Sequence, residues 1–372
     1  MNKLIIIGDD NVNTLGVIWS FSKHSIKVDL MILNSFSRVS VIKSKNVEKY
    51  YFINDEDDLI NSLNLYYINE VNKPVIITTS DLSTLIIDKN YDSLCSNFII
   101  SSIDNKQGNI NKYMDKYNQY RLSNKHKIKM AKTKIVDLKA NYNLDFPCIL
   151  KPIVSASGKK ADIRICNNYT EFNDTKKELL SLNYNKMLYQ EFLNYDYELD
   201  ICGFSYNGKV SIPGYIEKER IWPAGRGSTT FGKVKPNNDI LNVISDISKI
   251  MRDINYNGIF DIEVFVTEKG NNKEFYLNEI NFRNSAVAYS YGKSAVCYYW
   301  YLSCINNKMI LAPSIDKGYY TINEQADLHN LFEKKISLFR YWSDLRKSKI
   351  KMNFNIRDIK PCIYACLYKF FR

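Results

Sequence analysis

The stretch GIFDIEVFVTEKGNNKEFYLNEINFR, residues 258–283, decides the fold of this 372-residue chain. It consists of two runs in which apolar and polar residues alternate, joined by a turn rich in Gly and Asn at 268–272. Alternation with period two is typical of β-strands, and a Gly–Asn turn between two such runs predicts a β-hairpin.

Acidic side chains are expected to gather on one face of this hairpin. With the turn centred near Asn271, Glu263 lies opposite Glu279, and Asp261 lies opposite Asn281. Like charges directly opposed weaken a sheet unless a cation compensates them, and a hard divalent cation with oxygen ligands is the obvious candidate. Because Glu279→Gln would remove one of the two opposed charges, we expect this change to raise the thermal stability of the protein without metal. The alternative is a solvated hairpin face with scattered charges.

Composition indicates a soluble, globular, cytoplasmic protein. Hydrophobic residues make up 45% of the chain, enough for real cores, yet no apolar run approaches the roughly 18 residues that a membrane-spanning helix needs. The N-terminus MNKLIIIGDD ends its apolar segment after four residues, too soon for a signal peptide. The eight Cys are scattered and only three His are present, so neither a zinc site nor a disulfide framework is expected.

The positive charge is concentrated at one end of the chain. The net charge is +11, but from Lys334 onward eleven Lys or Arg stand against only Asp344 and Asp358, a net charge of +9. The preceding body is therefore nearly neutral, and a basic groove running through it is not expected. We predict no nucleic-acid partner.

The first hundred residues predict a βαβ opening and a small parallel sheet. Strands are expected at 4–7, 28–33, 48–53, 75–79 and 98–101, with helices between them. The turn GDDNVNTLG after the first strand lacks the G-x-G-x-x-G spacing that brings a backbone close to a pyrophosphate. A dinucleotide site is therefore not expected at this turn.

Two lysines and a small-residue loop form a candidate phosphate site. The segment 112–132 is polar and helical and contains Lys116, although a solvated helix face would look the same. FPCILKP predicts a short buried strand that ends at Lys151, and a buried lysine needs a partner. The loop around Ser157 and Gly158 has free backbone N–H groups that could cradle phosphates, or it is a plain hairpin turn.

Further candidate contacts follow along the chain. The apolar strand MLYQEFL, residues 187–193, could present backbone groups to an adenine ring, and a hairpin with Glu198 near its start comes next. The segment 217–234 is predicted to be an ordered anion-binding loop because it carries Arg220, Arg226 and three glycines. A helix is expected after it.

These motifs, taken in chain order, resemble the ATP-grasp superfamily over roughly residues 1–310. The residues that carry the resemblance are Lys116, Lys151 before a Gly/Ser loop, QEFL at 190–193, Glu198, Glu263 and EINFR at 279–283. More narrowly, the chain is similar to carboxylate-amine ligases of that superfamily, including D-aspartate ligase-like members and those found with cell-surface polysaccharide genes.

The resemblance implies an α/β and α+β architecture. A Rossmann-like domain over 1–103 would precede a small ATP-grasp lobe over 104–188 and a large lobe with the metal site over 189–312. A helical, basic extension over 313–372 would complete the chain. Two departures stand out: His24 replaces a glycine before the second strand, which touches only packing, and the phosphate loop has a single glycine, Gly158, which leaves its register open.

The resemblance also implies roles for individual residues. ATP would be held at its phosphates by Lys116, Lys151, Ser157, Gly158 and Arg283, at its adenine by Gln190, Glu191, Phe192 and Leu193, and at its ribose by Glu198. The ligands of Mg²⁺ (or Mn²⁺) would be Glu263, Glu279 and Asn281. The substrate would be contacted by Arg220 and Arg226. The family's chemistry joins a carboxylate to an amine through an acylphosphate made from ATP.

This resemblance implies an ATP-dependent carboxylate-amine ligase acting on an amino acid or sugar acid in cell-surface glycan or peptidoglycan synthesis. A phosphotransferase of the same fold and a nucleotide-binding subunit without turnover are the alternatives. A homodimer is compatible with the resemblance.

The tail allows two interpretations. Apolar residues from Leu328 to Leu345 recur at helical spacing, which predicts a helix packed on the core. The segment 363–371 is apolar and aromatic, is bracketed by Lys360, Lys369 and Arg372, and is too short to span a bilayer. It could instead lie in a membrane interface, which would place the enzyme peripherally at the inner face of the membrane.

Overall fold

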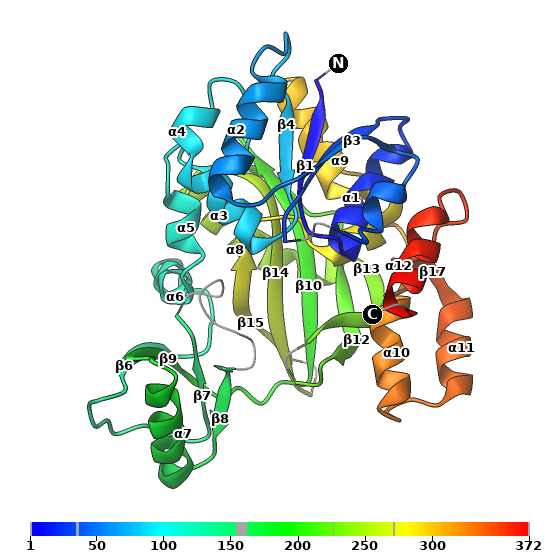
Figure 1. Cartoon of the computed structure of the whole chain (residues 1–372). Coiled ribbons are helices and arrows are strands. Elements are labelled where there is room, and N and C mark those ends of the chain that lie inside the picture. The colour runs from blue at the N-terminus through cyan, green and yellow to red at the C-terminus, as the bar shows by residue number, and fades with distance from the viewer. Residues whose placement is uncertain (1, 35–36, 154–161, 226, 271, 371–372) are drawn as a thin grey trace. The chain divides into compact units, whose positions relative to one another are not determined.

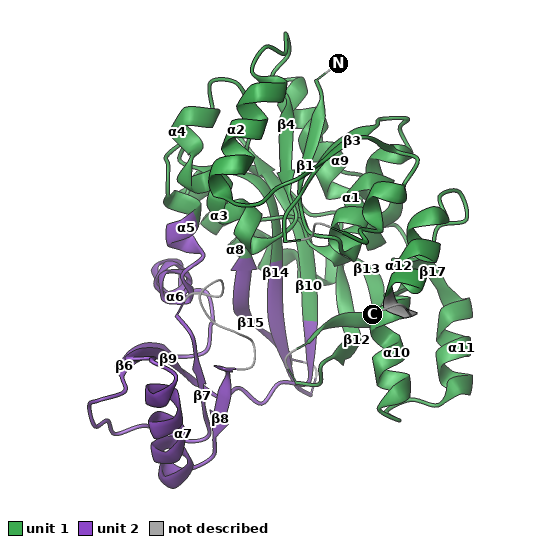
Figure 2. Ribbon diagram, viewed as in Figure 1, with its two compact units in different colours: residues 1–110, 199–261, 281–372 green, residues 111–198, 262–280 purple. Residues whose placement is uncertain are grey.

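The computed structural model describes residues 2–34, 37–153, 162–225, 227–270 and 272–370 (Figure 1). The chain forms two compact units: residues 1–110, 199–261 and 281–372 make unit 1, and residues 111–198 and 262–280 make unit 2 (Figure 2). These units do not coincide with the four consecutive segments expected from the sequence, because the hairpin strands contribute residues to both units.

A four-stranded parallel sheet forms the N-terminal part of unit 1, in the order β3-β2-β1-β4. Its elements are β1 (Leu4–Gly8), α1 (Val12–Ser22), β2 (Val28–Ile32), η1 (Val41–Lys43), β3 (Val47–Phe52), α2 (Glu56–Tyr67), β4 (Val75–Thr78), α3 (Asp81–Lys89) and α4 (Tyr91–Leu94). The predicted sheet is confirmed for four strands. The expected strand at 98–101 is wrong, since Ile99 makes only an isolated bridge to Val75.

The second sheet of the chain has nine strands, in the order β15-β14-β10-β12-β13-β16-β17, with β11 beside β10 and β5 beside β14. The strands are β5 (Ser102–Ile103), β10 (Tyr197–Tyr206), β11 (Lys209–Ser211), β12 (Gly214–Trp222), β13 (Ser228–Pro236), β14 (Tyr256–Lys269), β15 (Asn272–Asn281), β16 (Tyr319–Ile322) and β17 (Ser348–Lys351). β14 and β15 are the hairpin predicted from the sequence, and Gly270 in its turn has a φ of +62°, a conformation that glycine adopts readily.

The predicted loop at 217–234 is wrong, because most of this segment forms the antiparallel strands β12 and β13. Glu217 pairs with Lys233 across the two strands, and the Lys235 ammonium contacts the Glu217 carboxylate at 2.5 Å. The register shifts on either side of Arg220, as at a β-bulge. A bulge breaks the period-two alternation of apolar and polar residues, and for this reason the sequence pattern did not predict a strand through Arg220.

Unit 2 contains a four-stranded sheet in the order β6-β9-β7-β8. Its elements are α6 (Lys116–Lys125), β6 (Thr133–Asp137), β7 (Cys148–Lys151), β8 (Arg164–Cys166), α7 (Tyr169–Ser181) and β9 (Lys186–Glu191), and the short helix α5 (Asn109–Tyr113) leads into them. The single helix expected over 112–132 is divided, since Asp115 caps α6 by accepting hydrogen bonds from the N–H groups of Tyr117 and Asn118.

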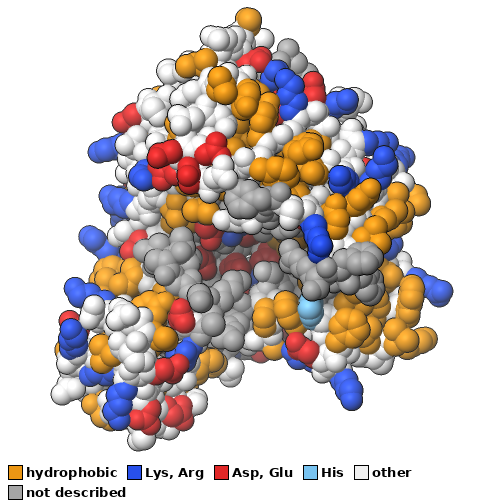
Figure 3. Space-filling view, in the orientation of Figure 1, with side chains coloured by type: hydrophobic (Ala, Val, Ile, Leu, Met, Phe, Trp, Pro, Cys, Tyr) orange, Lys and Arg blue, Asp and Glu red, His pale blue; other side chains and the backbone are white. Residues whose placement is uncertain are grey.

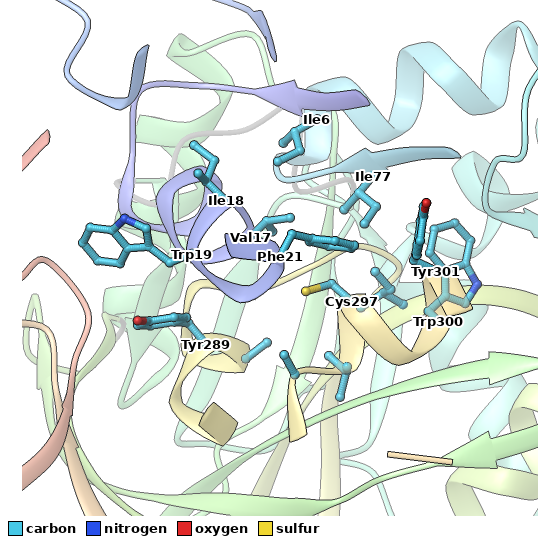
Figure 4. Close-up of a cluster of buried hydrophobic side chains, with 14 of the residues drawn as sticks. Ile6, Val17, Ile18, Trp19, Phe21, Ile77, Tyr289, Cys297, Trp300 and Tyr301 are labelled. Atoms are coloured by element: carbon cyan, nitrogen blue, oxygen red, sulfur yellow. The ribbon is translucent and has the colours of Figure 1, made fainter. Parts of the chain in front are cut away.

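The remaining elements complete unit 1. They are η4 (Asn237–Ile240), α8 (Leu241–Asp253), η5 (Ala286–Ser294), α9 (Val296–Ile305), α10 (Glu324–Phe332), α11 (Leu338–Lys347) and α12 (Lys360–Phe370). In the main core, buried side chains of α1 and α9 meet, and the rings of Phe21 and Tyr301 pack edge to face at 5.4 Å (Figure 4). His24 stacks on Tyr298, in keeping with the packing role expected for it.

The C-terminal tail is part of this fold and is not only helical, because β16 and β17 extend the sheet beside β13. The buried Asp358 carboxylate accepts hydrogen bonds from the Trp19 indole, the Ser44 hydroxyl, the Lys45 N–H and the Asn46 amide. The chain near its C-terminus is therefore fastened to the N-terminal parallel sheet region of the same unit.

Glu324 at the start of α10 gives a pH-dependent stability. Its side chain is 9% exposed, Oε2 accepts from the Asn353 N–H at 2.9 Å, and Oε1 is buried without a hydrogen-bond partner among the described residues. Burial raises the pKa of this carboxyl from 4.5 to about 7. The folded state therefore binds more protons than the unfolded state between these values, and stability falls as pH rises through this window.

We expect Glu324→Gln to remove this pH dependence, because an amide carries no charge to bury. The wild-type free energy of unfolding should fall by up to about 3 kcal/mol between pH 4.5 and 7 from this group, and the variant should lose that part of the slope. Urea unfolding at pH 5 and pH 8 measures it. Glu333→Gln, at the exposed end of the same helix, is the control and should retain the slope; a Glu324→Gln slope equal to the wild type would contradict the assignment.

Candidate functional site

A buried lysine lies at the centre of the candidate site in unit 2. Lys151 ends β7 and is 7% exposed. Burial and the nearby positive charge of Lys116 lower the pKa of Lys151 to about 8, and the carboxylates of Glu279 and Glu263 partly oppose that shift. Two lysines and two carboxylates predicted from separate parts of the sequence are therefore brought together.

Lys116 is held in this cluster at both its backbone and its side chain. It is the first residue of α6, its N–H donates to the Ile153 carbonyl at 3.3 Å, and its Nζ lies 3.4 Å from Glu279 Oε2. The two side chains are only 12% and 21% exposed. The charge of Glu279 is thus compensated by that of Lys116.

Gln119 locks α6 onto the hairpin strand β15. Its side chain is 1% exposed, its Oε1 accepts from the Ile280 N–H at 2.9 Å, and its Nε2 donates to the carbonyls of Ile280 and Tyr113. These contacts fix Lys116, one turn earlier on α6, relative to Glu279, the neighbour of Ile280. Sequence reasoning missed Gln119, and a polar residue one turn after a candidate lysine is too weak a signal to have found it.

Glu263 lies on β14, and its described cross-strand contact is with Asn278. The Asn278 side-chain amide donates to Glu263 Oε2 at 3.2 Å. The spacing from the turn predicted Glu279 opposite Glu263, and nothing in the sequence singled out Asn278. Both carboxylates nevertheless act on Lys151, so they lie in one electrostatic environment.

No group of three or more His, Cys, Asp or Glu in the described part of the chain could by itself hold a metal ion. The predicted ligand set contains two carboxylates, Glu263 and Glu279, and the amide of Asn281, two positions after Glu279 on β15. Oxygen donors of these kinds suit Mg²⁺, which commonly completes its shell with phosphate oxygens and water. The residues therefore fit a metal that arrives with a nucleotide.

Arg283 follows the hairpin and belongs to unit 1. Its Nε donates to Asp81 Oδ1 at 2.5 Å, and its Nη1 donates to the Asn284 carbonyl at 3.2 Å. Asn284 and Asn13 in turn bond each other, and Asn13 also donates to the Thr79 carbonyl. The segment that carries Arg283 is therefore tied to the carboxyl end of β4. Asp81, Asn13 and Asn284 were not singled out from the sequence.

The predicted adenine segment runs through the end of β9. Gln190 is 3% exposed and donates to the Thr133 hydroxyl, so its side chain supports the sheet. Glu191 Oε1 accepts from the Lys132 N–H, while the Phe192 N–H donates to the Pro147 carbonyl. The Phe192 ring is 38% exposed, and Leu193 is half-buried. Within this segment, Phe192 offers the most exposed ring surface.

The predicted ribose residue lies at the start of β10. Glu198 Oε1 accepts from the Tyr195 hydroxyl at 2.5 Å, and the Tyr195 ring stacks on Phe265 of β14 at 4.2 Å. The Glu198 carboxylate is therefore held in place by an aromatic neighbour.

Arg220, which was predicted to contact the substrate, is engaged by two carboxylates of unit 1. Its Nε and Nη2 donate to the two carboxylate oxygens of Asp327, and its Nη1 donates to Asp344 at 2.6 Å. The Arg220 side chain is only 14% exposed, and the two aspartates are buried. Because its donors are engaged inside the fold, we assign Arg220 a structural role instead of the predicted substrate contact. Arg226, Ser157 and Gly158 lie outside the described residues.

No protein-family model matches this sequence, and neither does any curated protein. Solved structures do match. N5-carboxyaminoimidazole synthetase from Staphylococcus aureus complexed with ADP has a TM-score of 0.66 at 16% identity, covering 90% of this chain and 88% of that one. L-amino acid ligase from Bacillus licheniformis has a TM-score of 0.62 at 12% identity, covering 81% and 74%.

A third structure is the biotin carboxylase domain dimer of Hydrogenobacter thermophilus 2-oxoglutarate carboxylase, in complex with MgADP, ADP and bicarbonate. Its TM-score is 0.61 at 17% identity, and the match covers 86% of this chain and 73% of that one. At these identities the likeness establishes the fold. The ATP-grasp fold and the α/β and α+β class predicted from the sequence are confirmed.

Proposed function

Starting from the fold that this chain shares with these ligases and synthetases, we propose that it is an ATP-dependent carboxylate-amine ligase that forms a C–N bond through an acylphosphate. The observation that carries the proposal is the cluster of Lys116, Lys151, Glu263 and Glu279 in unit 2. Such a cluster combines cations for phosphate oxygens with carboxylates for a metal ion.

In this proposal the side chains act on charge and position. Lys116 and Lys151 hold phosphate oxygens, and a bound phosphate would favour the charged form of Lys151, which burial alone disfavours. Glu263, Glu279 and Asn281 would hold Mg²⁺, or Mn²⁺ in its place, which would neutralise charge on the transferred phosphoryl group. Arg283 of unit 1 stays a phosphate contact implied by the resemblance, and Asp81 of the same unit would orient its guanidinium.

The substrates are a small carboxylate and a small amine, for which we propose an amino acid or sugar acid used in cell-surface glycan or peptidoglycan synthesis. The matched structures include an L-amino acid ligase and a synthetase complexed with ADP, which supports the choice of class. A cytoplasmic location and a homodimer are part of the same proposal, the latter supported by the dimer named for the biotin carboxylase domain.

Phosphate release from ATP tests this function, measured against pools of amino acids, sugar acids and dicarboxylates with and without amines. A ligase releases phosphate only when both an acid and an amine are present. Consumption of ATP with the acid alone, giving a stable phosphorylated product, would instead identify a phosphotransferase. ATP binding without turnover in any pool would identify a nucleotide-binding subunit.

Arg226 is the remaining candidate for the acid substrate. A guanidinium binds a carboxylate through two parallel hydrogen bonds that a lysine cannot reproduce. We expect Arg226→Lys to raise the KM for the acid about tenfold while changing the KM for ATP by less than about twofold. Steady-state kinetics with each substrate varied in turn measures this. Equal effects on both KM values would assign Arg226 to phosphate.

A further inference from the structure

One face of the last helix is apolar where a solvent-facing helix is normally polar. Ile363 and Leu367 are 46% and 43% exposed and stand four residues apart, so they share one side of α12, and Ile359, which directly precedes the helix, is 37% exposed. Ile356, just before the helix, is 76% exposed. We call these four residues the α12 face.

The opposite side of α12 packs on its own unit. Pro361 is buried, and the Tyr364 ring has the Lys43 ammonium 5.1 Å from its centre. A cavity of about 170 Å³ lies beneath the helix, lined in part by Val12, Val41 and Ala365. The helix α12 is therefore packed on unit 1, and its α12 face is exposed even so.

The charge around this face is basic because the acidic residues of the segment are turned inward. Asp344 and Asp358 are 0% and 4% exposed and are engaged in ion pairs and hydrogen bonds inside unit 1. Arg357 and Lys360, which alternate with the apolar residues of the face, are exposed. In this part of the chain, Arg357 and Lys360 therefore lie on the surface beside the α12 face, whereas Asp344 and Asp358 lie in the interior.

Exposed aromatic residues occur on the two preceding helices, α10 and α11. Phe339 and Trp342 of α11 are 85% and 54% exposed, and Phe332 at the end of α10 is 73% exposed. Hydrophobic side chains gather on the side of unit 1 where α10, α11 and α12 lie (Figure 3). No helix in the described part of the chain is long and apolar enough to cross a membrane.

From this combination we infer that the α12 face docks onto an anionic lipid surface. Apolar side chains enter the boundary between headgroups and acyl chains, while basic side chains beside them contact the headgroup charges. A second copy of the chain fits less well, because a two-fold symmetric contact would place Arg357 and Lys360 of one copy close to the same positive residues of the other. One face of an 11-residue helix is also far smaller than the roughly 800 Å² per partner of a stable interface.

Vesicle sedimentation tests this docking with the full chain, using phosphatidylcholine vesicles with and without phosphatidylglycerol at low salt. We expect sedimentation only with the anionic vesicles. Ile363→Glu combined with Leu367→Glu should weaken the binding at least tenfold. The matched control is Leu65→Glu combined with Val71→Glu, two residues that are 73% and 97% exposed elsewhere on unit 1, and it should bind as the wild type does.

A second pair of variants tests the charge. Arg357→Gln combined with Lys360→Gln should weaken binding to anionic vesicles by at least about fivefold, because each basic residue near such a surface adds about that factor. Arg252→Gln combined with Lys106→Gln, two exposed residues far along the chain, should have no effect.

Three results would overturn the inference. They are equal sedimentation with neutral and anionic vesicles, equal sedimentation of all variants, and a wild-type dimer that the Ile363→Glu and Leu367→Glu change converts to a monomer without any vesicle binding. The last would assign the α12 face to a second copy. None of the substituted residues belongs to the proposed ligase site, so ligase turnover of each variant in solution should match the wild type and reports on folding.

Discussion

Glu279→Gln is expected to abolish ligase activity while leaving the fold intact. The substitution hardly changes the side-chain volume but removes the charge that would hold the metal, and a central metal ligand contributes several kcal/mol of transition-state stabilisation. The loss in kcat/KM should therefore exceed about 10³-fold. Phosphate release with saturating ATP and magnesium measures it, and circular dichroism confirms the fold.

Glu274→Gln is the matched control, because Glu274 lies on the same strand, β15, and pairs with Lys129 at 2.7 Å at the surface. It should keep wild-type activity. A Glu279→Gln enzyme within tenfold of the wild type would show that Glu279 is not a metal ligand of a ligase. Loss of activity in both variants would point to the strand as a whole instead of the carboxylate.

The structure leads us to expect that Glu279→Gln lowers stability, whereas the sequence alone predicted that it would raise stability without metal. The sequence suggested that the change would relieve repulsion between the opposed carboxylates of Glu263 and Glu279. In the structure, however, Glu279 forms an ion pair with Lys116 and lies near Lys151. Removing its charge leaves two lysines with less compensation in a mostly buried place. The free energy of unfolding should therefore fall by about 1–2 kcal/mol instead of rising.

Arg220→Met is expected to destabilise the protein by about 3–5 kcal/mol. The methionine can fill much of the space, but the buried Asp327 loses both hydrogen bonds of its two carboxylate oxygens to the guanidinium, and Asp344 loses one ion pair. An uncompensated buried carboxylate has a large desolvation cost. Urea unfolding at neutral pH measures the change.

Arg340→Met provides the comparison, since Arg340 also contacts Asp344, at 2.9 Å, but is 55% exposed. Asp344 keeps its contacts with Arg220 and Lys347 when Arg340 is replaced, so we expect Arg340→Met to cost less than about 1 kcal/mol. Adding Asp327→Asn to Arg220→Met should restore part of the stability by removing the orphaned charge. If Arg220→Met unfolds as the wild type does but raises the KM of the acid, the original assignment to substrate would be correct.

Some features of this chain follow from local sequence. The strands of the hairpin and the N-terminal sheet were predictable because period-two alternation and short apolar runs act over a few residues. Lys151 was recognisable as the end of a buried strand because Pro147 and Pro152 delimit it. The fold itself was expected from a resemblance, carried in chain order by Lys116, Lys151 before a Gly/Ser loop, QEFL at 190–193, Glu198, Glu263 and EINFR at 279–283.

Other features exist only in the tertiary structure. The bulge on either side of Arg220 breaks the alternation and hides β12, and the aspartates that engage Arg220 come 107 and 124 residues later. Gln119 meets Ile280 across 161 residues, and Asp358 meets Trp19 across 339. A buried polar group must find its partner wherever the folded chain supplies one, and no local pattern records that choice. The sequence by itself therefore determined the hairpin, four strands of the N-terminal sheet and the chemical types of the candidate site, whereas only the tertiary structure decided which charges neutralise one another.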